Sequence, residues 1–277
     1  MNSSLVLGFF DGVHKGHRAV IESAFEFSDN VTLITFKESP SLYFNNSAEY
    51  ILSRKDSVEK IKSLGVKTVV ELDFNQIAKM RAKEYIEYLF ENYHPISIST
   101  GVDHTFGLNK EGNSDSLSQY KDFYHYLVKI VPMVWENNEI VSSTLIKNYI
   151  KKGDVEYANK LLESNFILEG KVIHGLKIGR TIGFPTANIR YPNNIVKLPY
   201  GVYSAIVNGK KSILNWGIKP TVNNTAEPFV EVHILNFNGD LYGKNIRIEV
   251  LKQIRGEKKF GNLEELKAQI KEDIKNA

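Results

Sequence analysis

The first half of the chain alternates short apolar runs with segments in which apolar residues recur at helical spacing. This pattern predicts strands over 5–10, 31–36, 67–72, 96–101 and 128–134, and helices over 19–27, 53–64, 82–93 and 116–126. Strands that alternate with helices are joined by right-handed crossovers, so we expect a mainly parallel α/β sheet. Sheets of this kind bind ligands at the carboxyl ends of their strands.

The pattern changes beyond residue 165. Two short helical segments, 144–152 and 155–163, close the first part. After them, closely spaced strand-like runs follow over 166–173, 201–207, 212–216, 229–237 and 246–251. Gly, Pro and Asn turns separate these runs, which favours a small antiparallel barrel, and the spacing of apolar residues predicts a covering helix over 262–274. We therefore expect two domains, 1–165 and 166–277.

Composition restricts the chemistry. The chain has no cysteine, which excludes disulfide scaffolds, thiolate zinc sites and cysteine nucleophiles and is compatible with a reducing compartment. No apolar run approaches the roughly 18 residues that span a membrane, and the first residues lack the basic region of a signal peptide. We expect a cytoplasmic protein with no membrane partner.

Charge is distributed unevenly between the two predicted domains. The net charge is +3, which does not indicate a nucleic-acid partner. Residues 1–165 contain 18 Lys and Arg against 22 Asp and Glu, a net of −4, whereas residues 166–277 contain 17 against 10, a net of +7. The basic half has either an ordinary solvated surface or an anionic ligand such as a nucleotide.

A first candidate site follows the first predicted strand. Gly12 and Gly16 lack a Cβ, so a phosphate can approach the backbone closely, and the N-terminus of the next helix offers free N–H groups. His14 and His17 are candidates to donate to a polyphosphate and to stabilise charge on an α-phosphoryl group under attack. Either histidine alone is more often structural, and a zinc site is disfavoured because no third ligand is nearby.

Two further segments of the first half have candidate binding residues. Ser142, Ser143 and Thr144 begin a predicted helix, and Lys147 follows one turn later. One hydroxyl is enough for a helix N-cap, so the others and Lys147 are candidates for phosphate contacts. Asp103 follows the strand predicted over 96–101, where it either faces a nucleotide or caps a turn.

A second candidate site lies in a glycine-rich segment at the start of the barrel. Thr186 and Asn188 are two residues apart, so they face the same side of an extended segment, and their neutral oxygens suit Mg²⁺ beside phosphate groups. The alternative is an ordinary glycine-rich loop with a turn proline. The candidate phosphate-binding residues that precede them are Gly175, Gly179 and Arg180.

Glu231 is the candidate catalytic base of this half. It lies on the predicted strand 229–237, which is otherwise apolar or neutral. A carboxylate on that strand could accept a proton from a substrate hydroxyl. The alternative is a glutamate on the exposed face of a strand.

These residues carry a resemblance to a known family over nearly the whole chain. The strings FDGVHKGH (10–17), GVDHTFG (101–107) and SSTLIK (142–147) resemble the FAD synthetase half of the bacterial bifunctional riboflavin kinase/FAD synthetases, within the nucleotidylyltransferase superfamily. The strings that resemble the riboflavin kinase half are GRTIGFPTAN (179–188), NWGIKPT (215–221), EVHIL (231–235), GDLYG (239–243) and RGEKKF (255–260).

The resemblance implies a fold and two reactions. The fold is a Rossmann-like nucleotidylyltransferase domain followed by a riboflavin kinase-like barrel with a C-terminal helix. ATP would phosphorylate riboflavin to FMN, and a second ATP would adenylylate FMN to FAD, with Mg²⁺ as the metal. The implied roles are Glu231 as the base that activates the ribityl 5′-hydroxyl, Thr186 and Asn188 at Mg-ATP, and Arg255 as a binding residue.

The first half departs from the family strings at several positions. Phe9 stands where the family commonly has Asn, Ser39 replaces a His, and Leu145 and Lys147 stand where the family has Arg. Two alternatives therefore stay open, namely a riboflavin kinase whose first half has lost its activity and a non-catalytic flavin-binding regulatory protein. In each case we expect small-molecule ligands and a monomer or weak homo-oligomer.

Overall fold

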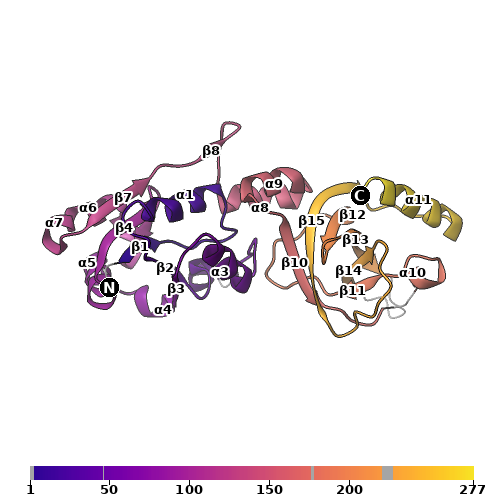
Figure 1. Ribbon diagram of the computed structural model, residues 1–277, viewed down its shortest axis with the longest axis horizontal. Coiled ribbons are helices and arrows are strands. Elements are labelled where there is room, and N and C mark those ends of the chain that lie inside the picture. Colours follow the sequence, from indigo (N-terminus) through magenta and orange to yellow (C-terminus); the bar gives the residue numbers. More distant parts are fainter. Residues whose placement is uncertain (1–2, 46, 176–177, 220–226) are drawn as a thin grey trace. The chain divides into compact units, whose positions relative to one another are not determined.

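The computed structural model describes residues 3–45, 47–175, 178–219 and 227–277 (Figure 1). The chain divides into two compact units, Met1–Leu145 and Ile146–Ala277. Helix α8 (Ser143–Lys152) crosses this boundary, and α9 (Val155–Leu162) belongs to the second unit. Both helices lie close to their predicted ranges, and Asp154 caps the start of α9 by accepting from the backbone N–H of Tyr157.

The first unit is built on an all-parallel sheet with the strand order β3-β2-β1-β4-β7. Its direction of progression reverses between β1 and β4, and ligands of such sheets bind beside this switch point. The parallel sheet is confirmed, although β1 ends before the predicted end because the chain turns away at Gly8. The strands are β1 (Ser3–Leu7), β2 (Val31–Phe36), β3 (Thr68–Leu72), β4 (Pro95–Gly101) and β7 (Leu127–Val131).

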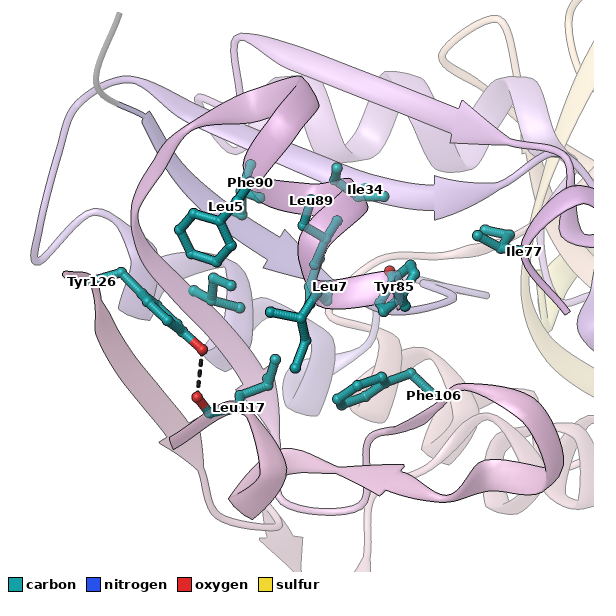
Figure 2. Close-up of a cluster of buried hydrophobic side chains, with 12 residues drawn as sticks. Leu5, Leu7, Ile34, Ile77, Tyr85, Leu89, Phe90, Phe106, Leu117 and Tyr126 are labelled. Atoms are coloured by element: carbon teal, nitrogen blue, oxygen red, sulfur yellow. Dashed lines mark hydrogen bonds between the residues drawn. The ribbon is translucent and has the colours of Figure 1, made fainter. Parts of the chain in front are cut away.

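Successive side chains of β1 point to opposite faces of the sheet, and apolar ones lie on both faces. Helices therefore cover both faces and bury these side chains. Val6 packs in a buried cluster with Ile21 of α1 and Ile61 of α3. Leu5 and Leu7 pack in another cluster, with α5 above them (Figure 2). The helices are α1 (Lys15–Ala24), α2 (Pro40–Asn45), α3 (Arg54–Ser63), α4 (Phe74–Ile77), α5 (Ala82–Tyr93), α6 (Ser114–Gln119) and α7 (Lys121–Tyr124).

One predicted helix of the first unit is interrupted. The pattern over 116–126 forms two short helices, α6 and α7, and His125 ends the second in a left-handed conformation. The hydroxyl of Tyr126 donates to the carbonyl of Leu117, which fixes this turn against the core (Figure 2). Periodicity does not reveal several short elements. These are the 3₁₀ helix η1 (Leu108–Lys110) and two strand pairs. Strand β5 (Thr105–Phe106) pairs with β6 (Gly112–Asn113), and β8 (Trp135–Glu136) pairs with β9 (Glu139–Ile140).

The second unit is an antiparallel barrel with the strand order β10-β15-β12-β13-β14-β11. The backbone N–H of Ile173 donates to the carbonyl of Asn188 at 2.8 Å, which connects the two edges and nearly closes the barrel. The predicted barrel is thus confirmed. The strands are β10 (Phe166–Lys171), β11 (Ala187–Ile189), β12 (Gly201–Val207), β13 (Lys210–Lys219), β14 (Glu227–Ile234) and β15 (Asn245–Gly256).

Helices of the second unit attach to the barrel through polar contacts as well as apolar ones. The amide of Asn159 in α9 donates to the carbonyl of Val250 in β15 at 2.9 Å. The predicted C-terminal helix is confirmed as α11 (Leu263–Lys275), and a short helix, α10 (Ile178–Thr181), lies in the glycine-rich segment. Within the described ranges, the helices are too short or too polar to cross a membrane.

Candidate active sites

The loop after β1 presents the start of α1 at the switch point of the sheet. Gly12 has a φ of +83° and Val13 a φ of +46°. Glycine adopts this conformation readily, but a β-branched residue is strained there. His14 is the N-cap of α1, and its Nδ1 accepts a hydrogen bond from the backbone N–H of His17 at 3.3 Å.

His14 and His17 form a stacked pair, with ring centroids 3.6 Å apart. Because Nδ1 of His14 accepts a hydrogen bond, we assign the proton of its neutral ring to Nε2. Burial, with a smaller effect of Lys60, lowers the pKa of His14 to about 3. Burial also lowers the pKa of His17 well below its usual value, aided by His14 and Lys60. Both rings are therefore neutral near pH 7, and each can donate one N–H to an anion.

The two serines at the start of α8 have structural contacts in this unit. Ser142 Oγ accepts from the backbone N–H of Leu145 at 3.2 Å, so it is the helix cap. Ser143 Oγ donates to the carbonyl of Asp11 at 2.9 Å and thus joins α8 to the loop after β1. Thr144 is exposed, and Lys147 lies beyond the boundary between the units. Phosphate contacts by these four residues stay predictions.

A cavity of about 870 Å³ extends along the carboxyl ends of the strands. The structure brings six predicted site residues of the first unit to this cavity, namely His14, Gly16, His17, Asp103, Ser142 and Ser143. Its volume lies in the range of small-molecule sites. The phenylalanines and tyrosines that line it are Phe9, Phe10, Phe36, Tyr43, Phe44, Phe74, Tyr85 and Phe106.

Part of this aromatic lining is open to solvent. Phe44 is 64% exposed and Tyr43 is 45% exposed, although both pack edge-on near Phe74. Large exposed aromatic groups beside a cavity suit a planar ligand. The sequence pattern missed this surface because α2 has only six residues, too few for a helical period to stand out.

The turn after β4 brings two ionisable residues to the cavity. The backbone N–H of His104 donates to the carbonyl of Gly101 at 3.1 Å, and Asp103 lies between them. Burial lowers the pKa of His104 to about 4, and Asp103 opposes this shift. His104 also lines the cavity, which the string around Asp103 did not indicate.

The register of the barrel aligns the predicted residues of the second site. Asn188 on β11 lies directly opposite Glu231 on β14, and Glu231 lies directly opposite Asn215 on β13. Directly paired residues share a face of the sheet, with Cβ atoms about 4.5–5.5 Å apart. The carboxylate of Glu231 therefore lies between two amide side chains. Asn215 belongs to a family string, but its spacing along the chain does not place it beside Glu231.

The glycine-rich segment packs closely on this row. An added Cβ at Gly175 would lie 2.6 Å from the amide carbon of Asn188, so this position has no room for a side chain. An added Cβ at Gly179 would collide with the carbonyl of Phe184 and lie 3.4 Å from Thr186 Oγ1. Asn188 is buried, and Thr186 is half-buried. The side chain of Arg180 and the motif residues 176–177 and 220–221 lie outside the described residues.

Arg255 forms an ion pair with α11. Its Nε and Nη2 donate to the two carboxylate oxygens of Asp273, each at 2.9 Å, and Gln269 donates to the same carboxylate. The side chain of Asp273 is 3% exposed. The guanidinium also lies 5.6 Å from the ring centre of Phe260. Arg255 thus attaches α11 to the end of β15, and ligand binding by this residue stays a prediction.

We predict that Asp273→Asn destabilises the second unit. The amide replaces a buried carboxylate and leaves the guanidinium of Arg255 without its charged partner. Breaking a buried ion pair from one side typically costs about 3–5 kcal/mol, and we expect about 3 kcal/mol because Arg255 is partly exposed. Denaturant unfolding measures this change, with Asp240→Asn, at an exposed loop position, as the control. Equal stability of the two variants would show that the pair contributes nothing.

Family models match both units. A model described as FAD synthetase matches residues 1–145, and one described as riboflavin kinase matches residues 162–277. This chain belongs to the bifunctional riboflavin kinase/FMN adenylyltransferase family. Curated relatives of that description include proteins from Bacillus subtilis, at 34% identity over 99% of this chain and 91% of the relative, and from Escherichia coli K12, at 32% identity over 97% and 90%.

A solved structure also has this fold over almost its full length. It is a Streptococcus pneumoniae protein described as a macrolide-efflux protein, with 32% sequence identity and a TM-score of 0.91. The alignment covers 99% of this chain and 93% of that protein. The two-unit architecture is thus shared with a crystal structure.

Ser39 illustrates how this member of the riboflavin kinase/FMN adenylyltransferase family departs from the common string. Its Oγ lies 2.8 Å from Ser41 Oγ, and its backbone N–H donates to the hydroxyl of Tyr50 at 3.1 Å. These contacts stabilise the beginning of α2, which carries Tyr43 and Phe44. In this chain, Ser39 therefore supports the aromatic side of the cavity.

Proposed function

We propose that this chain makes FMN from riboflavin and ATP in its barrel, and FAD from FMN and ATP in its first unit. Membership of the family supports both reactions. The observation that carries the proposal is the presence of two separate polar sites, Glu231 between two amides and the stacked histidines at the start of α1. We propose the cytoplasm as the compartment, since the cysteine-free composition suits reducing conditions.

In the barrel, Glu231 would act as the general base. Its carboxylate accepts the proton of the ribityl 5′-hydroxyl while that oxygen bonds to the γ-phosphorus of ATP and the bond to ADP breaks. Asn188, directly opposite on β11, would orient the phosphate side of the reaction. Gly175 would keep Asn188 in place, because the backbone there lies against the amide.

Magnesium is part of the proposal, and the donor set fits it. Thr186 and Asn188 offer two neutral oxygens at one end of β11, and Mg²⁺ commonly takes one or two protein oxygens while substrate phosphates and waters supply the rest. When bound, the ion would neutralise charge on the β- and γ-phosphates.

In the first unit, the phosphate of FMN would attack the α-phosphorus of ATP, and pyrophosphate would leave. The nucleophile is already anionic, so the protein needs to orient the reactants and stabilise charge rather than remove a proton. His14 and His17 are neutral donors at the cavity, and the aromatic lining around Phe74 offers a surface for the flavin ring. The 870 Å³ cavity supports binding of both substrates in the first unit.

Product analysis tests the proposed function. The protein is incubated with Mg-ATP and riboflavin, and separately with Mg-ATP and FMN, and the flavins are separated by chromatography. We expect FMN from the first incubation and FAD from the second. FMN without FAD would support the monofunctional kinase, and neither product with retained flavin would support the regulatory protein.

We predict that Asn188→Ala lowers FMN formation and spares FAD formation from supplied FMN. The variant removes a proposed Mg-ATP ligand from the barrel, whereas the adenylylation site lies in the other unit. Thr186→Ala should behave in the same way. Initial rates of both reactions measure the effect, and an equal loss of both activities would contradict the assignment of one reaction to each unit.

A further inference from the structure

Contacts from other segments of the chain hold the loop that carries the two histidines in a strained conformation. Val13 is β-branched and has a φ of +46°, a left-handed conformation that β-branched residues rarely adopt. Such strain persists only where the surroundings determine the backbone. Val13 is also fully buried, so its side chain fixes the direction of the strained turn.

Three distant donors hold the backbone and side chain of this loop. The backbone N–H of Ile51 donates to Asp11 Oδ1 at 2.8 Å, and Ser143 Oγ donates to the carbonyl of Asp11 at 2.9 Å. Lys60 Nζ donates to the carbonyl of Gly12 at 3.0 Å. The third contact orients the peptide that immediately precedes the strained residue.

Lys60 differs from the other two donors in carrying a positive charge. It lies in the last turn of α3, is half-buried, and does not line the cavity. Its charge nevertheless acts on both histidines, because it contributes to the lowered pKa of each ring. The ammonium group is thus fixed against the loop at a point outside the lining of the cavity.

We propose that Lys60 is a positioning residue for adenylyl transfer. It holds the Gly12 carbonyl, and with it the strained turn that places His14 and His17, and it adds a fixed positive charge behind the phosphate-binding end of the cavity. The inference rests on the proposed FAD-forming activity of the first unit.

The test compares Lys60→Met and Lys60→Arg with the matched control Lys62→Met. Methionine keeps the length of the stem but removes the charge and the donor, arginine keeps both, and Lys62 is an exposed residue of the same helix. We expect Lys60→Met to lower kcat for FAD formation about 10- to 100-fold, the range for losing a hydrogen bond from a charged group. Lys60→Arg should recover most of this loss, and Lys62→Met should match the wild type.

Riboflavin phosphorylation by the same variants reports on folding, because it takes place in the other unit and should not change. A Lys60→Met variant with wild-type FAD formation, or a Lys60→Arg variant as inactive as Lys60→Met, would overturn the inference. Failure of the wild type to form FAD would instead reject the proposed function.

A second readout does not require turnover. We expect Lys60→Met to weaken equilibrium ATP binding at least fivefold in an Asn188→Ala background, in which the proposed barrel site is disabled. A Lys60→Met variant that forms no FAD but binds ATP with unchanged affinity would also overturn the proposed role of Lys60.

Discussion

Glu231→Gln is expected to reduce FMN formation by about 10²- to 10⁴-fold, the typical effect of losing a general base. The amide keeps the shape of the side chain between Asn188 and Asn215 but cannot accept the proton of the ribityl hydroxyl. Riboflavin binding should persist, because the substitution leaves the apolar interior of the barrel unchanged. Initial rates of FMN formation and fluorescence titration with riboflavin measure the two properties separately.

Glu169→Gln is the matched control. It makes the same substitution on β10, where Glu169 forms a surface ion pair with Arg247 at 3.3 Å. Such pairs contribute at most about 1 kcal/mol, so this variant should phosphorylate riboflavin normally. A Glu231→Gln rate within about threefold of the wild type, far below the range for a lost base, would remove Glu231 from the mechanism.

His17→Ala is expected to reduce FAD formation from FMN by about 10²- to 10³-fold, while riboflavin phosphorylation continues. Negative charge grows on the α-phosphoryl group as pyrophosphate leaves, and loss of one preorganised donor typically costs about 2.7–4 kcal/mol. Because the pKa of His17 is lowered, the ring donates as a neutral imidazole, so the loss should be similar across pH 6.5 to 8.5. Initial rates of FAD formation over that range measure it.

His14 has two roles that different substitutions separate. His14→Ala removes both the ring donor and the N-cap of α1, whereas His14→Asn keeps a good capping residue. Both variants should lose FAD formation to the extent given for His17→Ala, but only His14→Ala should also lower the melting temperature. Normal FAD formation by His14→Asn and His17→Ala together would contradict the assignment of the histidine pair.

Much of the architecture follows from local patterns. Helix α5 was predicted at its observed bounds, because its apolar face repeats at helical spacing. Glu84 accepts a hydrogen bond from the backbone N–H of Arg81 at its start. The α3 prediction was also close, with Ser53 as the N-cap. Short elements such as α2 and β11 could not be predicted, since a few residues contain too little of any period.

The two candidate sites also have features that the sequence reveals and features that depend on the tertiary structure. The strings around His14, Glu231 and Asn188 could be found in the sequence, because neighbouring residue types there indicate their chemistry directly. The placement of Asn215 beside Glu231 depends on the register of β13 and β14, and one residue of slip would put it on the other face. Sequence spacing does not determine that register.

The sequence by itself therefore determined the order of the longer strands and helices along the chain, the change from a parallel sheet to an antiparallel barrel, and the residue types of both sites. Only the tertiary structure decided which distant residues support those sites. Lys60 and Gly12 are 48 positions apart, and Ser143 and Asp11 are 132 apart. No local period or motif links such pairs, because their contacts arise where Lys60 of α3 and Ser143 meet the loop after β1.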